Sequence, residues 1–358
     1  MRKKINSKKY MAMAGVSIFT LAIFCGCSRA EELEIMKNSE DMNSTTFFAM
    51  DTVMEIQIEG DEELLTEAEN MVADLEGRLS VTNESSEIGM LNSNKIGRLS
   101  GDSTEILTGA LQVCQDTDGA LDISIYPVLR EWGFTTGEYK IPSAEAIDEL
   151  LDYVDYSQIQ VNIREDGQSD VVLPEDMEID LGSVVKGYTG ELLAQYFKDN
   201  GVTSALINLG GNVECLGSKP DGRPWKIAIK SPYPDSKEGL LGVLEAEDVS
   251  IITSGGYERF FEEDGKRYWH ILNPENGRPA DDGLVSVTIV GKDGLRGDGL
   301  STALFVMGLD EAEKYWREAG DFDAIFVTEN MVYVTEDIAS SFSLTPEYAK
   351  LGLKVLAK

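Results

Sequence analysis

The segment from Ile179 to Gly211, IDLGSVVKGYTGELLAQYFKDNGVTSALINLGG, constrains the fold of this chain more than any other. Apolar residues recur at helical spacing after Lys186, so we expect a turn, a helix and a strand, with Asp180, Gly182 and Ser183 before the helix. A helix N-terminus suits an anion such as phosphate, and Lys186 in the first turn adds a full positive charge. The alternative is a capped amphipathic helix that binds no ligand.

Residues 1–27 have the pattern of a bacterial secretory signal. Five cations among the first nine residues precede an apolar run from Met11 to Phe24, which is short for a membrane span. Gly26 before Cys27 resembles a lipoprotein processing site, so we expect Cys27 to carry lipid as the first mature residue. Ordinary cleavage, with Cys27 as a free thiol, is the alternative. Residues 28–45 are polar and aperiodic, which predicts a flexible tether before a domain at 46–358.

The chain is strongly acidic, with 31 lysines and arginines against 64 aspartates and glutamates and a net charge of −33. Loss of the signal cations would make the mature protein more negative still. This balance argues against nucleic acid as a partner and against electrostatic adhesion to an anionic membrane, so a lipid would have to hold the protein there. A site for an anionic ligand must therefore be locally positive or use a metal.

Cysteine and histidine content excludes two further classes of protein. Beyond the signal only Cys114 and Cys215 remain, and the whole chain has one histidine. These numbers exclude a disulfide scaffold and a zinc site of cysteine and histidine type. We expect both cysteines to be small buried residues, and the sequence leaves open whether they pair.

Helix and strand patterns are mixed without strict alternation, which favours an α+β fold over a doubly wound sheet. One continuous strand is expected from Phe47 to Glu59, and the alternating WKIAIK at 225–230 predicts another. Helices are expected at 62–79, 103–117, 143–154, 299–308 and 310–319, with a polar loop at 79–92.

Two patterns carry candidate binding chemistry. His270, the only histidine, stands where a strand runs into the turn NPENGRP, a place where ligand contacts gather, although a lone histidine is often structural. Thr253, Ser254 and Gly255 follow an apolar strand and could offer hydroxyl and N–H groups to a phosphate. A plain strand end is equally consistent with that second pattern.

Asp298 and Thr302 are four residues apart, so on a helix they share a face. Carboxylate and hydroxyl oxygens suit Mg²⁺, which keeps several waters and takes further ligands from substrate phosphates. The alternative is that Asp298 caps the helix while Thr302 bonds back to the backbone.

Taken in their order, these patterns resemble the ApbE family of FAD:protein FMN transferases. The resemblance covers nearly all of the mature chain and rests on Met50-Asp51-Thr52, DGALDISIYPVLREWGF (118–134), IDLGSVVKGYTGE (179–191), INLGGN (207–212), TSGGYERFF (253–261), HILNPENGRP (270–279) and DGLSTALFVMG (298–308). It implies an ApbE-like flavin transferase domain at 46–358. Its fold would be α+β, with mixed sheets and flanking helices in two closely associated lobes and the FAD site between them.

The resemblance also implies a reaction, in which the pyrophosphate of FAD is cleaved, FMN moves to a threonine or serine hydroxyl of an acceptor protein, and AMP leaves. The implied FAD contacts are Met50, Ala120, Leu121, Asp122, Asp180, Lys186 and Ile271, with Thr253, Ser254 and Gly255 as further candidates from the phosphate-binding pattern. Ser183, Asp298 and Thr302 would hold Mg²⁺, with Mn²⁺ as the other choice. Lys186 and Asp298 would neutralise and position phosphate, and His270 would orient or deprotonate the acceptor hydroxyl.

Four positions depart from the family pattern. Asp51 replaces a glycine, Glu191 an aspartate and Ser301 a carboxylate of some members, while Thr82 stands where an aromatic residue is common. Thr82 bears most on function, because a flavin pocket without this stacking would favour water over an acceptor hydroxyl. The alternative function is therefore a Mg²⁺-dependent FAD pyrophosphatase that yields FMN and AMP. A flavin-binding storage lipoprotein is a third hypothesis.

Signal and resemblance together predict where the protein works. We expect an extracytoplasmic enzyme held to the bacterial cell membrane by its lipid, on the cell surface or the periplasmic side. Its expected partners are FAD and acceptor flavoproteins such as redox-pump subunits or secreted reductases.

Overall fold

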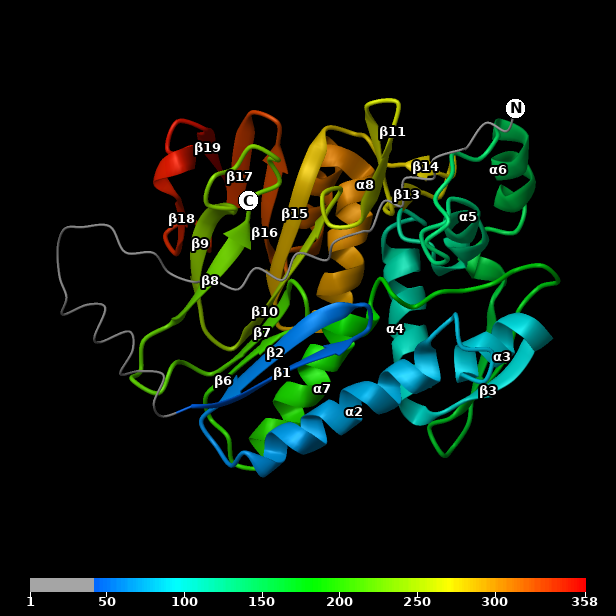
Figure 1. Ribbon diagram of the computed structural model, residues 1–358, viewed down its shortest axis with the longest axis horizontal. Helices are drawn as coiled ribbons and strands as arrows, with labels where there is room; N and C mark the ends of the chain where they lie inside the picture. The colour runs from blue at the N-terminus through cyan, green and yellow to red at the C-terminus, as the bar shows by residue number, and fades with distance from the viewer. Residues whose placement is uncertain (1–41) are drawn as a thin grey trace, which may run out of the picture. The chain divides into compact units, whose positions relative to one another are not determined.

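A nine-stranded sheet runs through the protein in the computed structural model, which describes residues 42–358 (Figure 1). Its strand order is β1-β2-β6-β7-β10-β15-β16-β17-β19, and neighbours are antiparallel except for the parallel pair β17 and β19. The strands are β1 (Asn43–Ala49), β2 (Thr52–Ile58), β6 (Ala205–Asn208), β7 (Asn212–Leu216), β10 (Val249–Gly255), β15 (Leu284–Gly291), β16 (Asp323–Thr328), β17 (Met331–Thr335) and β19 (Gly352–Leu356). Because β1 and β19 form its two edges, the sheet joins both ends of the described chain.

Two three-stranded sheets and two short hairpins accompany the large sheet. One small sheet has the order β18-β9-β8 and the other β3-β5-β4. The strands are β8 (Trp225–Lys230), β9 (Leu240–Ala246), β18 (Phe342–Leu344), β3 (Ile96–Leu99), β4 (Gln160–Ile163) and β5 (Ser169–Val172), with hairpins β11 (Phe260–Glu263) and β12 (Lys266–Trp269), and β13 (Leu272–Asn273) and β14 (Arg278–Pro279).

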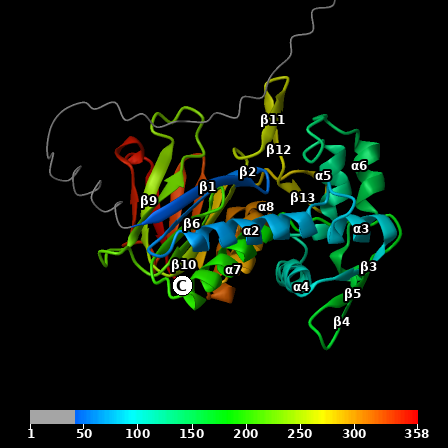
Figure 2. The same ribbon diagram turned by 60° about the horizontal axis from the view of Figure 1, so that its bottom comes forward.

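The helices fall into two groups (Figures 1 and 2). Helices α7 and α8 pack on strands of the large sheet, and α2 packs on α7 and β1. Helices α3, α5 and α6 gather beside the large sheet with β3, and α4 contacts α8. Their bounds are α2 (Glu63–Leu79), α3 (Glu87–Asn94), α4 (Gly101–Asp116), α5 (Tyr126–Glu131), α6 (Ala144–Leu151), α7 (Val185–Asp199) and α8 (Gly294–Ala319), with 3₁₀ turns η1 (Ile123–Ile125), η2 (Tyr156–Gln158) and η3 (Pro346–Tyr348). The expected α+β class is confirmed.

The expected signal, Cys27 and most of the expected tether lie outside the described residues. Strand β1 begins at Asn43, inside the expected tether at 28–45, because Asn43 pairs with Ile58 of β2. Between residues 42 and 358, no helix is long and apolar enough to cross a membrane.

The single strand expected from Phe47 to Glu59 is instead the hairpin of β1 and β2. Met50 and Asp51 form its turn with positive φ angles of 48° and 60°. Two-residue hairpin turns need this backbone, which glycine and asparagine usually supply. The turn was missed because Met50 is neither of these. The N–H of Met50 is satisfied by the carboxylate of Glu76 on α2.

Two helix boundaries also differ from expectation. The loop expected at 79–92 contains the start of α3, which Ser86 caps by accepting a hydrogen bond from the N–H of Gly89 at 2.8 Å. Helix α8 begins five residues earlier than expected and is capped by Asp293, whose carboxylate accepts from Arg296 N at 2.8 Å. The expected break between 308 and 310 is confirmed, because Gly308 has non-helical angles of 75° and 173°.

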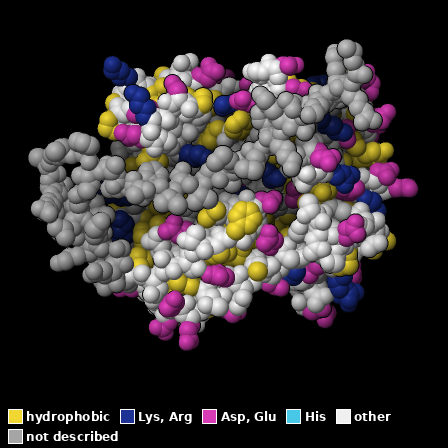
Figure 3. Space-filling view, viewed as in Figure 1, with side chains coloured by type: hydrophobic (Ala, Val, Ile, Leu, Met, Phe, Trp, Pro, Cys, Tyr) yellow, Lys and Arg dark blue, Asp and Glu magenta, His cyan; other side chains and the backbone are white. Residues whose placement is uncertain are grey.

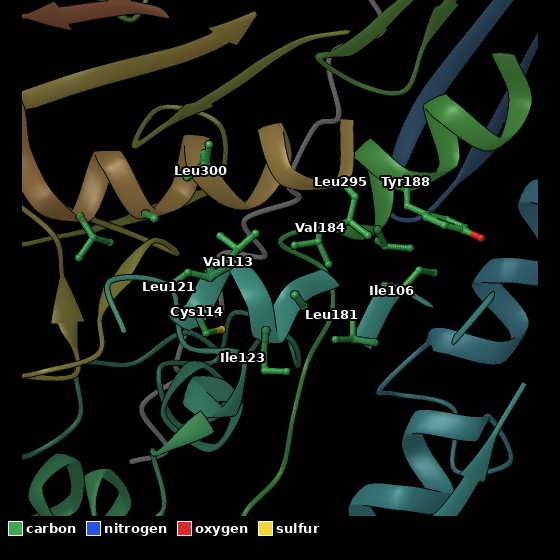
Figure 4. Packing of buried hydrophobic residues seen from close by; sticks show 14 of the residues in the cluster. Ile106, Val113, Cys114, Leu121, Ile123, Leu181, Val184, Tyr188, Leu295 and Leu300 are labelled. Carbon is green, nitrogen blue, oxygen red and sulfur yellow. The ribbon is translucent and has the colours of Figure 1, made fainter. Parts of the chain in front are cut away.

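The largest core cluster joins α4, α8 and the segment before α7 (Figure 4). Val113 and Cys114 of α4 pack with Leu121, Val184 and Leu300 in this cluster. Cys114 and Cys215 are both buried and both free thiols, so the expectation of small buried residues is confirmed. The cluster fixes the loop at 120–123 against the start of α7 and the first turns of α8.

Helices α7 and α8 meet at two glycines. A Cβ at Gly187 would lie 2.0 Å from the carbonyl oxygen of Gly294, and a Cβ at Gly294 would lie 2.7 Å from the carbonyl oxygen of Gly187. Glu191 of α7 accepts the N–H of Gly294, and Asp298 of α8 accepts the N–H of Gly187 at 2.9 Å. These two hydrogen bonds fix the position of the first turn of α7 relative to the first turn of α8.

Replacing Gly187 with alanine should separate these helices. We expect Gly187→Ala to lower the free energy of unfolding by about 3 kcal/mol, because a backbone carbonyl occupies the space of the new methyl group. Gly77→Ala in α2 is the matched control, since no atom lies within 4 Å of its Cβ and it should be neutral or stabilising. Urea denaturation of both variants measures the difference, and equal stabilities would contradict the contact.

Candidate functional site

A cleft of about 830 Å³ opens where strands of the large sheet and of the β18-β9-β8 sheet meet the start of α7, α8 and the loop at 120–125. Its walls come from the β1–β2 turn, the loop at 120–125, the turn at 180–186, strands β7, β8 and β10, the segments at 257–259 and 270–274, and α8. Acidic side chains are spread over the face shown in Figure 3. Lys186, Lys230 and Arg259 line the cleft beside six acidic residues, so positive charge for an anionic ligand is available there at these three side chains.

The start of α7 points its first turn at this cleft, as the sequence predicts. Val184 is the N-cap and supplies no side-chain hydrogen bond, and Lys186 stands in the first turn. Asp180 turns back to accept the N–H of Gly182 at 2.8 Å. Burial raises the pKa of Asp180, while the nearby charges of Arg259 and Lys186 oppose that rise. The helix start and Lys186 thus lie together at the cleft, where the sequence predicts an anion-binding position.

Asp298 and Thr302 reach the same part of the cleft from α8. Asp298 is 4% exposed, and burial raises the pKa of its carboxyl despite the adjacent charge of Lys186. Since Asp293 caps α8, the alternative in which Asp298 is only the helix cap does not hold. The hydroxyl of Thr302 lies 3.4 Å from that of Ser254, which bonds Ser301 at 2.7 Å.

These donors fit a magnesium ion. Asp298, Thr302 and Ser183 line one cleft and offer a buried carboxylate and hydroxyl or carbonyl oxygens, the hard ligands that Mg²⁺ prefers. Among residues 42–358, no group of three or more His, Cys, Asp or Glu side chains could hold a metal by itself. An ion here would therefore depend on waters and ligand phosphates for the rest of its shell.

His270 lines the cleft directly after β12. Its Nδ1 lies 3.2 Å from the carbonyl oxygen of Arg259. A carbonyl only accepts, so Nδ1 carries the proton and Nε2 is the free acceptor. Burial, with Arg259 and Lys186 nearby, lowers the pKa of His270 to about 4. An unperturbed imidazole has a pKa of about 6.5, and the loss of solvation of the imidazolium in the cleft accounts for the lower value.

The loop at Ala120, Leu121 and Asp122 lines the cleft as expected, but the Asp122 carboxylate is also structural. It accepts from the N–H and hydroxyl of Ser124 at 2.8 and 2.6 Å and from Tyr156 N at 3.1 Å. Asp122 thus fixes its own loop, which presents backbone and apolar groups to the cleft.

Two residues of the expected phosphate turn reach the cleft and one does not. Thr253 and Ser254 line it, although Thr253 shares its hydroxyl with Thr288 at 2.8 Å. Gly255 is not among the lining residues, because it is the last residue of β10 and pairs with Ser286 of β15. This segment is therefore a strand end rather than an open phosphate loop.

Met50 and Ile271 line the cleft, and so do Asp51 and Thr82. Thr82 is exposed, with its hydroxyl 3.1 Å from that of Ser80. Asp51 lies 3.9 Å from Arg259, whose guanidinium also donates to the carbonyl oxygen of Phe134. The aromatic residues that line the cleft in the described chain are Tyr257 and His270.

Sequence reasoning missed the wall formed by Lys230, Tyr257 and Glu258. The ammonium of Lys230 lies 5.2 Å from the centre of the Tyr257 ring. Burial raises the pKa of Glu258 to about 7, against the pull of Lys186 and Lys230. The alternation of WKIAIK predicts strand β8, but no local signal shows that this strand borders the cleft.

Comparison with known proteins agrees with this fold and cleft. The ApbE family pattern matches residues 50–326. A FAD:protein FMN transferase of Klebsiella pneumoniae is 38% identical over 214 residues, 60% of this chain and 65% of that protein. One of Vibrio cholerae is 29% identical over 336 residues, 91% of this chain and 97% of that protein.

Solved structures give the same result. The crystal structure of the ApbE protein of Thermotoga maritima superposes with a TM-score of 0.73 at 27% identity and covers 87% of this chain and 99% of that one. The apo flavinyl transferase ApbE of Pseudomonas stutzeri gives a TM-score of 0.71 at 28% identity, with coverage of 87% and 96%. The fold is thus the α+β fold of the ApbE proteins. The chain belongs to the ApbE family.

The single histidine makes its pKa directly measurable. We expect the imidazole signals of His270 in NMR spectra to titrate near pH 4. Because the unfolded chain takes up this proton at about pH 6.5, the free energy of unfolding should decrease as the pH falls from about 6.5 through 4. Arg259→Gln should raise the midpoint, because one positive neighbour is removed. A midpoint at the ordinary value would show that the ring is solvated.

Proposed function

We propose that this protein is a FAD:protein FMN transferase that moves FMN from FAD to a threonine or serine hydroxyl of an acceptor flavoprotein and releases AMP. The relatives bearing that name support the proposal. The observation that carries it is the meeting of Lys186, Asp298 and Thr302 at the start of α7, inside a cleft large enough for a dinucleotide.

The described residues supply what phosphoryl transfer requires. Lys186 and the N–H groups of α7 face the pyrophosphate and neutralise its oxygens. Asp298, Thr302 and Ser183 would hold Mg²⁺, or Mn²⁺, which when bound neutralises further phosphate charge. The phosphorus of the FMN half forms a bond to the acceptor oxygen while its bond to the AMP oxygen breaks. Met50, the loop at 120–122, Asp180 and Ile271 would position FAD.

His270 takes the proton of the acceptor hydroxyl in this proposal. Its Nδ1–H donates to the carbonyl of Arg259, so Nε2 is the nitrogen without a proton, on a residue that lines the cleft. The lowered pKa keeps the ring neutral, and therefore able to accept a proton, across the physiological range.

Export and lipid anchoring belong to the same proposal. The basic and apolar pattern of residues 1–27 and the cysteine at its end support a lipid-anchored, extracytoplasmic enzyme. The net charge of −33 supports acceptor proteins rather than nucleic acid as partners. Redox-pump subunits and secreted reductases are the acceptors we propose.

The first test uses residues 28–358 with FAD and Mg²⁺, with and without an acceptor domain that carries a Ser/Thr-Gly-Ala-Thr sequence. Chromatography follows AMP and FMN, and intact mass follows the acceptor. We expect AMP release to require the acceptor, which gains one FMN. Free FMN formed equally fast without acceptor would establish the hydrolase instead, and tight FAD binding without turnover would establish a storage protein.

Loss of the metal-binding carboxylate should abolish turnover. We expect Asp298→Asn to lower kcat at least about 100-fold, because the charge that holds the metal is gone. Asp310→Asn, an exposed acid on the same helix, should leave kcat unchanged.

His270→Ala should also stop transfer while FAD affinity, followed by flavin fluorescence, is retained. Unchanged transfer in His270→Ala would exclude its role as base.

The exposed Thr82 in the cleft favours FAD hydrolysis as the second candidate function. Without an aromatic ring at this position, the isoalloxazine is packed less firmly and water reaches the phosphorus more readily. We expect Thr82→Tyr to lower FMN release without acceptor by about 5-fold or more, which corresponds to about 1 kcal/mol of stacking. Thr82→Val is the control, and the same decrease in both variants would contradict stacking.

A further inference from the structure

Strand β8 borders the cleft with an unpaired edge. It is the terminal strand of the order β18-β9-β8, and its ladder partner is β9 alone. Ile227, Ala228, Ile229 and Lys230 all line the cleft. Successive side chains of a strand point to opposite faces, so four consecutive residues line one cavity only when the strand edge faces it. Within the described chain, the backbone of 226–230 makes no hydrogen bond away from β9.

This edge ends in a pair of opposite charges. Lys230 lies over the ring of Tyr257 and makes no ion pair among the described residues. Glu258 faces the same cleft from the next wall, also without a hydrogen bond or ion pair there. A Cβ at Gly211 would lie 3.7 Å from Oε1 of Glu258, so Gly211 borders this carboxylate.

The β8 wall leads directly to the transfer site and is not needed for the proposed FAD contacts. Glu258 is close enough to Lys186, Lys230 and Asp298 for each to affect its pKa, so it connects β8 to the phosphate position. The residues proposed to contact FAD lie on the hairpin turn, the loop at 120–122, the start of α7, β10 and the segment at 270–271. Strand β8 contributes none of them.

We propose that β8 is the acceptor subsite, where an extended segment of the acceptor polypeptide adds as a fourth strand beside β8 and presents its hydroxyl to the phosphate position. This inference rests on the proposed transferase function. Strand addition recognises the main chain, and pockets for alternate side chains give specificity. Lys230 and Glu258, at the end of the edge, offer a donor and an acceptor to the main chain of the entering segment.

A polypeptide fits this wall better than a second nucleotide or the AMP half of FAD. An edge strand presents alternating N–H and C=O groups at the spacing of another strand, which a nucleotide cannot match. The attacking oxygen must also approach roughly in line with the departing AMP oxygen, so acceptor and AMP need separate walls of the cleft. The side chains of Ile227 and Ile229 are already buried in a hydrophobic cluster. The groups of β8 that can bind a ligand here are therefore the backbone N–H and C=O groups of its unpaired edge.

Amide hydrogen exchange tests the pairing. The probe is the acceptor domain with its hydroxyl residues changed to valine, so that it binds without receiving FMN. We expect this probe to slow exchange at 227–230 at least 10-fold, whereas FAD alone does not. Strand β19 is the internal control, because it is an edge strand of the large sheet and β8 belongs to a different sheet. The exchange rates of its amides should not change. Protection of β8 by FAD alone, or no protection by the acceptor, would overturn the proposal.

Substitution of Lys230 gives an independent readout. We expect Lys230→Met to raise the KM for the acceptor about 10-fold while the KM for FAD stays within 2-fold. Lys226→Met is the matched control in the same strand, because Lys226 is exposed and does not line the cleft. A raised KM for FAD would assign the wall to the nucleotide, and an unchanged KM for the acceptor would also reject the subsite.

The two proposals fail separately. A wild-type enzyme that transfers no FMN to the unmodified acceptor domain contradicts the proposed function. A wild-type enzyme that transfers FMN without protecting β8 contradicts only the acceptor subsite.

Discussion

The contact between α7 and α8 at Gly187 and Gly294 determines where the chemistry can occur. Two helices approach this closely only where neither carries a side chain. The approach lets the Asp298 carboxylate accept the N–H of Gly187, so a hydrogen bond joins this buried side chain to the helix that carries Lys186. Glu191, one methylene longer than the aspartate usual in the family, closes the same junction from the other side by binding the N–H of Gly294. The phosphate position is thus rigid because it lies between two locked helix starts.

Charge placement follows from that junction. The protein carries many more acids than bases, and its cleft places Lys186 near both the half-buried Asp180 and the buried Asp298, with Arg259 also near Asp180. Removing these carboxylates from water raises their pKa values, and the lysine and arginine charges offset part of that cost. Three cations and six acids line the cleft, so an anionic dinucleotide would meet positive charge there at Lys186, Lys230 and Arg259.

Local sequence predicted the elements whose cause is local. The start of α7, the alternation of β8 and the break at Gly308 each follow from residue spacing, and the structure confirms them. The β1–β2 turn was missed because Met50 and Asp51 adopt positive φ without a glycine. Similarly, the pKa of His270 depends on Arg259 and on burial by distant segments, which no window of sequence contains. The clustering of His270, Asp298 and Lys186 was predicted through family resemblance, while the β8 wall required the sheet order itself.

The strand order of the large sheet has a consequence for how the protein folds. Strand β2 pairs with β6, and helices α2 to α7 lie between these two strands in the sequence. Such long-range pairing makes folding slow, because the entropy of closing a long loop is lost before the contacts form. The cleft draws residues from Met50 to Thr302, so it exists only after most of the chain has been made. A nascent or truncated chain that lacks α8 would contain the start of α7 and Lys186 but not the Asp298 carboxylate opposite, so this half of the cleft would have no counterpart.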